Sequence, residues 1–244
     1  MGGAAAVLPA DQAVLSSKRR LKGALAVRRI FNLAANPSIH PMKKTLVLFV
    51  VLSAIGGLSA QPIDLPAPQR TGGMPLMEAL AKRVTGRAFD SRELSAQQLA
   101  DLCWAGFGVN RPDGRRTAPS ASNKQEIEIY LLLKQGAYVY DASRQGLQLV
   151  AAGDLRAPMR VDAPVIVLYV ADLAKRGSGT PESRKQASSV DSGFISENIY
   201  LYCASEGLAT GYRGGFDRAA LRAKLALRAD QEIVGIQPVG YPKA

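Results

Sequence analysis

The sequence predicts an α+β fold, or a mixed α/β sandwich, for residues 75–244, because helix-like and strand-like segments alternate with both hairpins and long crossovers. Two segments rich in Ile, Tyr, Leu and Val, 126–134 and 137–141, are separated by a tight turn and predict a hairpin. The nearly continuous apolar run 164–171 is typical of a central strand buried on both faces. The helix expected over 190–206 has apolar residues around much of its circumference, which indicates a central position or a subunit interface.

The individual elements follow from local signals along the chain. Leu76, Met77 and Leu80 share one side of a short amphipathic helix. Ser95 begins the next helix, because Gln98 three residues later completes a capping box. The expected elements are helix 75–83, a helix from Ser95 to Gly106 or Gly108, strands 126–134 and 137–141 around the Gln135-Gly136 turn, a third strand 147–150, strand 164–171, a polar loop 176–185, helix 190–206 closed by Gly207, a helix capped by Asp217 and ending near Leu227, and a last strand 233–239.

The net charge of +11 does not indicate a nucleic-acid-binding protein, because much of it lies outside the predicted domain. Residues 1–60 hold eight of the 31 Lys and Arg residues and one of the 20 Asp and Glu residues, so the remainder has a net charge of +4. Such a surplus suits an anionic small ligand as well as it suits DNA, and the sequence has neither a basic stripe nor a nucleic-acid-binding motif. We therefore expect a small-molecule partner and no nucleic acid.

Residues 42–60 have the architecture of a secretory signal peptide. Two lysines follow Met42, an apolar run covers 45–55, and small residues lead to Ala60. The run is too short for a comfortable membrane span of about 20 residues, so we expect cleavage near Ala60, export to the periplasm and no stable membrane span. The alternative is an uncleaved N-terminal anchor.

Two further segments complete the expected domain organisation. Residues 1–41 precede a signal peptide that itself starts with a methionine, so we interpret them as an extension of the gene model. Residues 61–74 are rich in Pro and Gly and are expected to be a linker to the folded domain 75–244.

The histidine and cysteine content limits the chemistry of the domain. The only histidine, His40, lies upstream of it, which excludes a Ser-His-Asp triad, a Cys-His pair and a His-ligated zinc there. Cys103 and Cys203 could pair in an oxidising compartment, but the simpler interpretation is two half-buried thiols.

Three local clusters contain groups that could bind a ligand, and the first is an alternating basic segment. Arg83, Thr85 and Arg87 would point the same way in an extended chain and could hold a phosphate through forked, charge-assisted donors. Taken alone, the same residues fit a solvated basic turn.

The second cluster is a loop of small and polar residues just before a strand, formed by Pro119, Ser120, Ala121, Ser122 and Asn123. Its short side chains let a flat ligand approach the backbone, and the Asn123 amide could donate to and accept from a heteroaromatic edge. The alternative is an ordinary surface turn. The third cluster, the glycine-rich segment 207–216, permits close backbone approach to a ligand or is simply a Gly-rich helix exit.

In this order the clusters resemble the nitroreductase family of FMN-dependent flavoproteins over residues 75–243. The resemblance rests on four motifs, which are the opening Arg-x-Thr-x-Arg-x-Phe at 83–89, the Pro-Ser-Ala-Ser-Asn loop at 119–123, the Asn-Ile-Tyr-Leu helix at 198–201 running into Gly207-Leu208, and the closing Gly-Tyr-Pro at 240–242. Two more segments, Tyr-Val-Tyr-Asp at 138–141 and Gly-Asp-Leu-Arg at 153–156, are more similar to the branch related to thiazoline and oxazoline dehydrogenases.

The resemblance implies a nitroreductase-like α/β sandwich with a central mixed sheet and a long helix through which two chains form a homodimer. It implies that FMN lies between the subunits, with its phosphate and ribityl chain on Arg83, Thr85 and Arg87. The 119–123 loop would reach the flavin from the partner subunit, and Gly214 and Gly215 would present backbone groups near the isoalloxazine. Of the basic residues that family members carry beyond the closing Gly-x-Pro, this chain offers Lys243 alone.

The implied activity is hydride transfer between a reduced donor, NAD(P)H, and a small organic substrate. Because the flavin carries this chemistry, the resemblance implies no catalytic side chain and no metal. The chain departs from the pattern at Thr85, where serine is more usual, and it has no extra helical excursion to shape a substrate pocket. The alternatives are an exported flavin- or small-ligand-binding module with little turnover, and a basic surface-binding protein.

Overall fold

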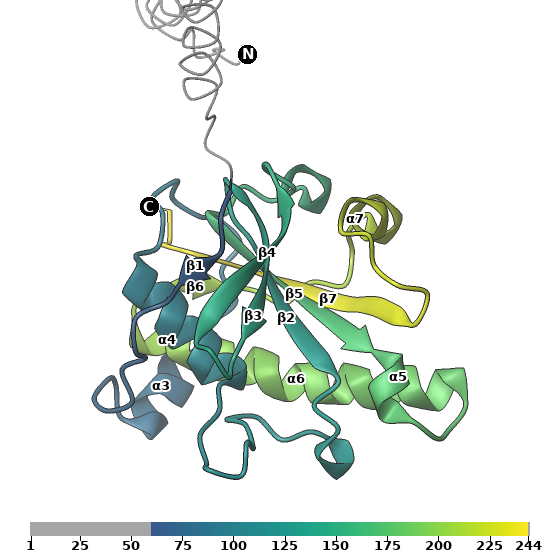
Figure 1. The fold of residues 1–244 in the computed structure, drawn as a ribbon. Coiled ribbons are helices and arrows are strands. Elements are labelled where there is room, and N and C mark those ends of the chain that lie inside the picture. The colour runs from purple at the N-terminus through teal and green to yellow at the C-terminus, as the bar shows by residue number, and fades with distance from the viewer. Residues whose placement is uncertain (1–59, 244) are drawn as a thin grey trace, which may run out of the picture. The chain divides into compact units, whose positions relative to one another are not determined.

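A seven-stranded sheet in the order β1-β4-β3-β2-β5-β7-β6 forms the centre of the structure (Figure 1). The computed structural model describes residues 60–243, so the segment 1–41 and all but the last residue of the expected signal peptide lie outside the described residues. The strands are β1 (Ile63–Asp64), β2 (Ile127–Leu132), β3 (Gly136–Asp141), β4 (Gly146–Ala152), β5 (Val165–Asp172), β6 (Ala209–Thr210) and β7 (Gln231–Gly240). The helices are α3 (Leu76–Lys82), α4 (Ala96–Phe107), α5 (Leu173–Arg176), α6 (Pro181–Ser205) and α7 (Arg218–Lys224), with 3-10 turns η1 (Ala121–Asn123) and η2 (Ala157–Met159).

The predicted α+β fold is confirmed, and the sheet differs from the expectation in one detail. Every strand pairing in the described sheet is antiparallel, whereas the family resemblance implied a mixed sheet. The connection from β5 to β7 contains α5, α6, the short strand β6 and α7, and β7 runs antiparallel to β5.

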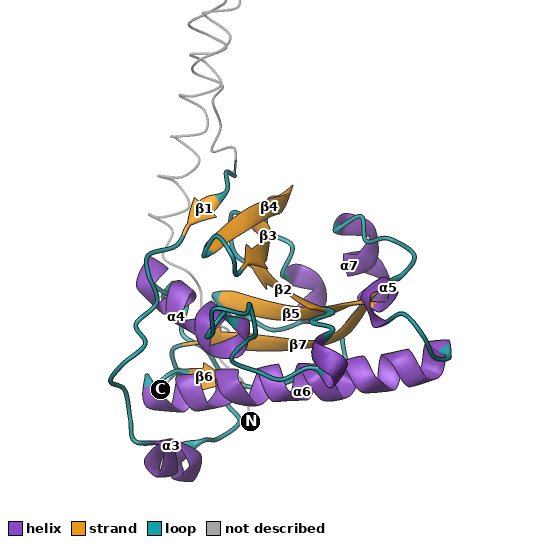
Figure 2. Cartoon of the chain, turned by 60° about the horizontal axis from the view of Figure 1, so that its bottom comes forward, coloured by secondary structure: helices purple, strands orange, loops and turns teal. Residues whose placement is uncertain are grey.

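Alternating side chains of the central strands build one core on each face of the sheet. Val165, Val167 and Tyr169 of β5 belong to the core that the sheet shares with α4 and α6. Ile166 and Leu168, which alternate with these residues, belong to the core on the opposite face of the sheet, together with α7. Figure 2 shows α6 running along one face of the sheet and α7 on the other. The apolar run at 164–171 is therefore a strand buried on both faces, as predicted.

The segment 61–74 is packed on the domain rather than forming the free linker that its composition indicated. β1 pairs with β4, and Leu65 is buried in the core against α4. The backbone N–H of Gln69 donates to Asp101 of α4 at 2.7 Å, and that of Met74 donates to Ser205 of α6 at 2.8 Å. The prolines give this segment an extended conformation, which lets it lie along the helices without regular structure.

The long helix α6 begins nine residues earlier than expected, because the second half of the polar segment taken for a loop, residues 181–185, belongs to the helix. The Thr180 side chain caps the helix by accepting from the Ser183 N–H, and Pro181 occupies the first helical position. In the N-terminal part of α6 the buried face is formed by small or charged residues such as Ser188, Asp191 and Ser192. The sequence there has no apolar periodicity that would predict a helix. The loop is confined to residues 177–180.

The other elements agree with the sequence to within a few residues, including the capping box of Ser95 and Gln98 at the start of α4. None of the helices within residues 60–243 is long and apolar enough to cross a membrane.

Candidate functional site

The predicted phosphate segment 83–87 leaves α3 and runs beside β6 and the C-terminal residues. The Gly86 N–H donates to the Thr210 carbonyl at 2.8 Å, and the Lys243 N–H donates to the Ala88 carbonyl at 3.2 Å. A Cβ at position 86 would lie 2.7 Å from the Cβ of Ala209, so only glycine allows this approach. The segment is thus fixed by its backbone, which leaves its side chains free to contact a ligand.

The basic side chains of this region have no acidic partners. Arg83, Arg87 and Lys243 form no ion pair within residues 60–243. Arg87 and Lys243 line one cavity of about 410 Å³, with Gly86 and Tyr200 also in its wall. The structure therefore brings these predicted residues together, and their uncompensated charge suits an anion.

Tyr200 of α6 is the centre of this region, and sequence reasoning gave it no role in the site. Its ring lies 5.4 Å from the Arg83 guanidinium, and its hydroxyl lies 3.4 Å from Oγ1 of Thr85. The same hydroxyl accepts the Tyr212 N–H at 2.8 Å. Tyr200 thereby joins the basic segment to the glycine-rich segment. The Asn-Ile-Tyr-Leu motif contained it, but only as a helix marker.

The glycine-rich segment packs directly against the basic segment. A Cβ at Gly211 would lie 2.9 Å from the Gly86 carbonyl oxygen, so the two backbones touch. Arg213 then forms a two-hydrogen-bond bridge with Ile236 of β7. Gly214 and Gly215 follow; both are exposed, neither has a positive φ, and a Cβ there would meet nothing within 4 Å. Nothing in the described chain requires glycine at these two positions.

The 119–123 loop lies elsewhere, against the N-terminal half of α6. The Ala121 N–H donates to Oδ2 of Asp191 at 3.0 Å. Asp191 and Tyr200 are nine residues apart, which is about 13 Å along a helix. One chain therefore does not bring the Pro119, Ser120, Ala121, Ser122 and Asn123 loop to the basic segment.

Below this loop lies a buried charged cluster that the sequence did not reveal. Glu126 and Asp191 are almost completely buried, and Nη1 of Arg176 donates to both, at 3.3 and 3.2 Å. Burial, with the neighbouring Glu126 carboxylate, raises the pKa of Asp191 to about 6, while the Ala121 N–H and Arg176 oppose this shift. Arg176 and Asp191 went unrecognised because their segments carried no motif.

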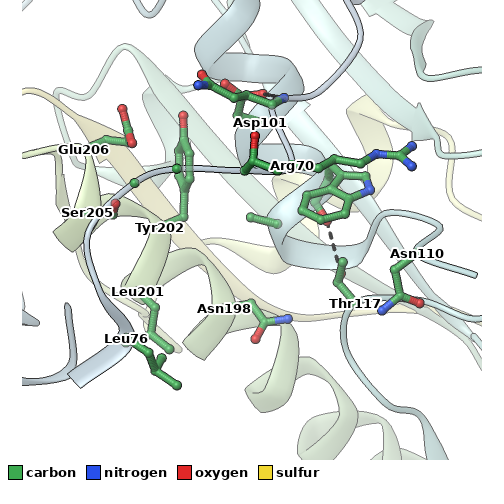
Figure 3. A pocket seen from close by; sticks show the side chains of 16 residues that line it. Arg70, Leu76, Asp101, Asn110, Thr117, Asn198, Leu201, Tyr202, Ser205 and Glu206 are labelled. Carbon is green, nitrogen blue, oxygen red and sulfur yellow. Dashed lines mark hydrogen bonds between the residues drawn. The ribbon is translucent and has the colours of Figure 1, made fainter. Parts of the chain in front are cut away.

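Another cavity contains none of the predicted ligand-binding residues. It measures about 670 Å³ and lies between the 69–76 segment, α4 and α6. Figure 3 shows Asn198, Leu201 and Tyr202 of α6 and Arg70 of the 69–76 segment around this cavity. The Arg70 guanidinium lies 5.5 Å from the centre of the Trp104 ring.

The two cysteines are free thiols, and both are fully buried rather than half-buried as expected. Burial raises the pKa of both Cys103 and Cys203 well above the usual range, so neither is a nucleophile at neutral pH. Within residues 60–243 no group of three His, Cys, Asp or Glu side chains could hold a metal ion.

Comparison with known proteins agrees with this fold. The sequence profile of the nitroreductase family matches residues 80–241. A protein from Methanocaldococcus jannaschii described as a nitroreductase is 24% identical over 168 residues, which is 63% of this chain and 85% of that protein. A crystal structure from Ralstonia eutropha JMP134, also described as a nitroreductase, is 38% identical with a TM-score of 0.73, over 77% of this chain and 92% of the other.

One more distant structure shares the fold alone. A chain of the Escherichia coli microcin synthetase McbBCD complex matches 74% of this chain and 78% of its own length, with a TM-score of 0.60 at 16% identity. The profile covers more than half of the chain, and the Ralstonia eutropha protein is covered almost completely. The chain therefore belongs to the nitroreductase family, and it is an oxidoreductase.

Proposed function

We propose that the chain is an FMN-dependent oxidoreductase that transfers hydride between NAD(P)H and a small organic substrate. The observation that carries the proposal is a cavity lined by Arg87 and Lys243, with Arg83 stacked on Tyr200 in its wall; none of the three cations has an acidic partner in the described structure. Thr85 lies within the same segment and offers a hydroxyl beside the two arginines. Two forked cations, an ammonium and a hydroxyl fit a terminal phosphate.

The residues present fit FMN at its ring end as well as at its phosphate end. Gly214 and Gly215 lie two and three residues after Tyr212, which Tyr200 ties to the basic segment. Their Cα atoms face open space, so a flat ring can reach the backbone without a clash. Glycine at both positions is explained by a ligand better than by any contact within the chain.

Bound FMN supplies the hydride chemistry, and the side chains of this protein hold and orient it. Arg83, Arg87 and Lys243 neutralise the phosphate, while Tyr200 keeps the 83–87 segment in register with the glycine-rich segment. The Ser122 and Asn123 side chains are exposed on a turn whose backbone is held in a left-handed conformation. Such a fixed turn can present the Asn123 amide to a flavin edge.

A homodimer completes the proposed site, because the 119–123 loop is remote from the basic segment within one chain. Val190 and Phe194 of α6 are 54% and 45% exposed, and they lie on the turns that pack beside this loop. Leu76, Met77 and Leu80 of α3 are also exposed. A second copy that covers these residues would stabilise both chains by burying apolar surface, and it would supply the loop to the other flavin.

The first test is the absorption spectrum of purified residues 61–244 after incubation with excess FMN and removal of free flavin. A flavin spectrum supports the proposal, and a colourless protein contradicts it. NAD(P)H oxidation then separates an enzyme from a flavin-binding module with little turnover, because only the enzyme cycles the flavin. Sedimentation at micromolar concentration tests the dimer, and a monomer with full FMN occupancy would contradict the shared site.

We also propose that the protein is exported to the periplasm and begins near Gln61 after cleavage of the 42–60 signal peptide. The support is the order of lysines, apolar run and small residues in that segment. N-terminal sequencing of protein recovered from the periplasm would show Gln61 or a neighbour first. An intact 1–41 segment would contradict the proposal.

A further inference from the structure

The 119–123 loop is connected to the long helix by one hydrogen bond. Among the hydrogen bonds of the described structure, the bond from the Ala121 N–H to Asp191 is the one that joins residues 119–123 to α6. The remaining bonds of the loop are internal, such as the Asn123 N–H that donates to the Ser120 carbonyl, or involve the next two residues, Lys124 and Gln125. The hydrogen-bonded link between the exposed loop and the long helix therefore depends on the state of one buried carboxylate.

The loop backbone needs such a restraint. Ser122, Asn123 and Gln125 have φ values of 54°, 52° and 48°, a region that residues other than glycine occupy at a cost. Three such residues within four positions persist only when surrounding contacts hold them. Two residues outside the loop hold its first turn: Gln125, whose N–H donates to Oγ of Ser120, and Asp191 of α6, which accepts the Ala121 N–H.

Asp191 is itself part of a charge-unbalanced cluster. The groups that face it are Glu126 immediately before β2, the Arg176 guanidinium from α5, and the Ala121 N–H from the loop. Ser188 of α6 donates its hydroxyl to Oε1 of Glu126, and Arg184 of α6 donates to the Leu173 carbonyl rather than to either carboxylate. Two buried carboxylates thus share one guanidinium, and Oε2 of Glu126 has no hydrogen-bond partner in the described structure.

This arrangement gives the cluster two states. With both carboxylates ionised the cluster has one uncompensated negative charge, and the Ala121 N–H makes a charge-assisted bond that stabilises the loop. With one proton bound the cluster is neutral, the carboxyl of Asp191 can donate to the free oxygen of Glu126, and its bond to the Ala121 N–H is weaker. The buried cluster and the exposed loop are therefore coupled through a single atom, Oδ2 of Asp191.

We propose that Asp191 is a positioning residue for the flavin site, whose ionised carboxylate holds the 119–123 loop in its flavin-contacting conformation and whose protonation releases it. The proposal rests on the function proposed above, in which this loop contacts the FMN of the partner subunit. Because burial raises the pKa of Asp191 to about 6, the loop is held above that pH and loosened below it.

The test combines amide hydrogen exchange with FMN binding from pH 5 to 7.5. Exchange of the Asn123 and Lys124 amides, corrected for intrinsic rates and measured without FMN, reports the loop itself. In wild type we expect their protection to fall about tenfold as the pH drops, since a charge-assisted bond becomes a neutral one. The Kd for FMN should rise over the same range in wild type.

Two variants break the connection from opposite sides. Asp191→Asn keeps a neutral acceptor and supplies an amide that can donate to Glu126, so it should show the low-pH behaviour at every pH. Ala121→Pro removes the N–H donor, and the extended conformation of Ser120 (φ −137°, ψ 149°) accepts a following proline. Both should lose the pH dependence, whereas the matched control Asp141→Asn, which alters a carboxylate that holds only the β3–β4 turn, should keep the wild-type profile.

The phosphate of FMN also titrates near pH 6, as phosphate monoesters do. Its effect on the Kd is the same in every variant, so the difference between variants reports Asp191 alone. Wild-type protection that does not change with pH, or the same pH profile in Asp191→Asn as in wild type, would overturn the role of Asp191. A wild-type protein that binds no FMN at any pH would overturn the proposed function instead. The exchange measurement distinguishes the two failures because it is made without FMN.

Discussion

The C-terminal and N-terminal halves of α6 support their neighbouring segments by different physical means. Near Tyr200, the 83–87 segment is held by backbone hydrogen bonds and close glycine contacts, and its half-buried Arg83 and exposed Arg87 form no ion pair in the described structure. Near Asp191, the 119–123 loop is exposed while the charges are buried beneath it. A ligand can use the charges of the first region directly, whereas the charges of the second act only through the loop that they hold.

The largest effect should come from breaking the buried cluster. Arg176→Ala leaves Glu126 and Asp191 without their shared cation, and removing one partner of a buried charge network costs about 3–5 kcal/mol. Chemical denaturation should show a loss of this size in the free energy of unfolding at pH 7.5. Lys185→Ala, which breaks the exposed pair with Glu232, is the matched control and should cost less than about 1 kcal/mol. Equal losses in the free energy of unfolding would mean that the buried ion pairs of Arg176 contribute no more to stability than the exposed pair of Lys185.

The next effect concerns the cations of the other region, which form no ion pair in the described structure. Arg83→Ala with Arg87→Ala should raise the Kd for FMN on the order of a hundredfold, since charge-assisted hydrogen bonds contribute roughly 1.5–3 kcal/mol each. Folding stability should change little, because neither arginine forms an ion pair within residues 60–243. Dissociation measured by recovery of FMN fluorescence tests this, with Arg144→Ala on the exposed β3–β4 turn as control.

The double variant should keep much of its reactivity when excess FMN is supplied, because the phosphate contacts are remote from the redox ring. Asn123→Ala should behave in the opposite way and alter flavin reactivity more than flavin retention. A double arginine variant that holds FMN as tightly as wild type would disprove the phosphate assignment.

A smaller effect should appear in the pH dependence of stability. The pKa of Asp191 is raised in the folded protein above its usual value, so the folded state binds a proton that the unfolded state releases. The stability contributed by this proton is present below about pH 4 and is lost as the pH rises through about 6. A tenfold difference in proton affinity between the folded and unfolded states corresponds to about 1.4 kcal/mol, so the change should be on the order of 2 kcal/mol. Asp191→Asn should lack it in denaturation curves measured at pH 4.5 and 7.5, and an unchanged slope would contradict the assignment.

The smallest effect should come from the hydroxyl that joins the basic and glycine-rich segments. Tyr200→Phe removes the acceptor of the Tyr212 N–H and should weaken FMN binding about fivefold, for a hydrogen bond worth about 1 kcal/mol. Tyr202→Phe removes a comparable bond, to the Gln98 carbonyl on α4, away from the basic segment. It should leave FMN affinity unchanged in the same titration, and equal weakening by both variants would refute a specific role for Tyr200.

The sequence by itself determined the class of fold, most of its elements and the residues of the basic segment. The continuous apolar run of β5 and the capping box at Ser95 are local patterns that each follow from one stretch of chain. The start of α6 could not be predicted from the sequence, because the helix buries a face of serines and Asp191 there instead of apolar residues. Such buried polar groups need hydrogen-bond partners on other elements, as Asp191 has in Arg176.

Only the tertiary structure decided which residues meet. It placed Lys243 and Tyr200 beside the 83–87 segment, packed residues 61–74 on the domain, and moved the 119–123 loop to the far half of α6. It also brought Glu126, which precedes β2, together with Arg176 and Asp191, which lie 50 and 65 residues further along the chain on α5 and α6. Local patterns report what each segment can form, whereas buried charge pairing depends on long-range contacts that no single segment contains.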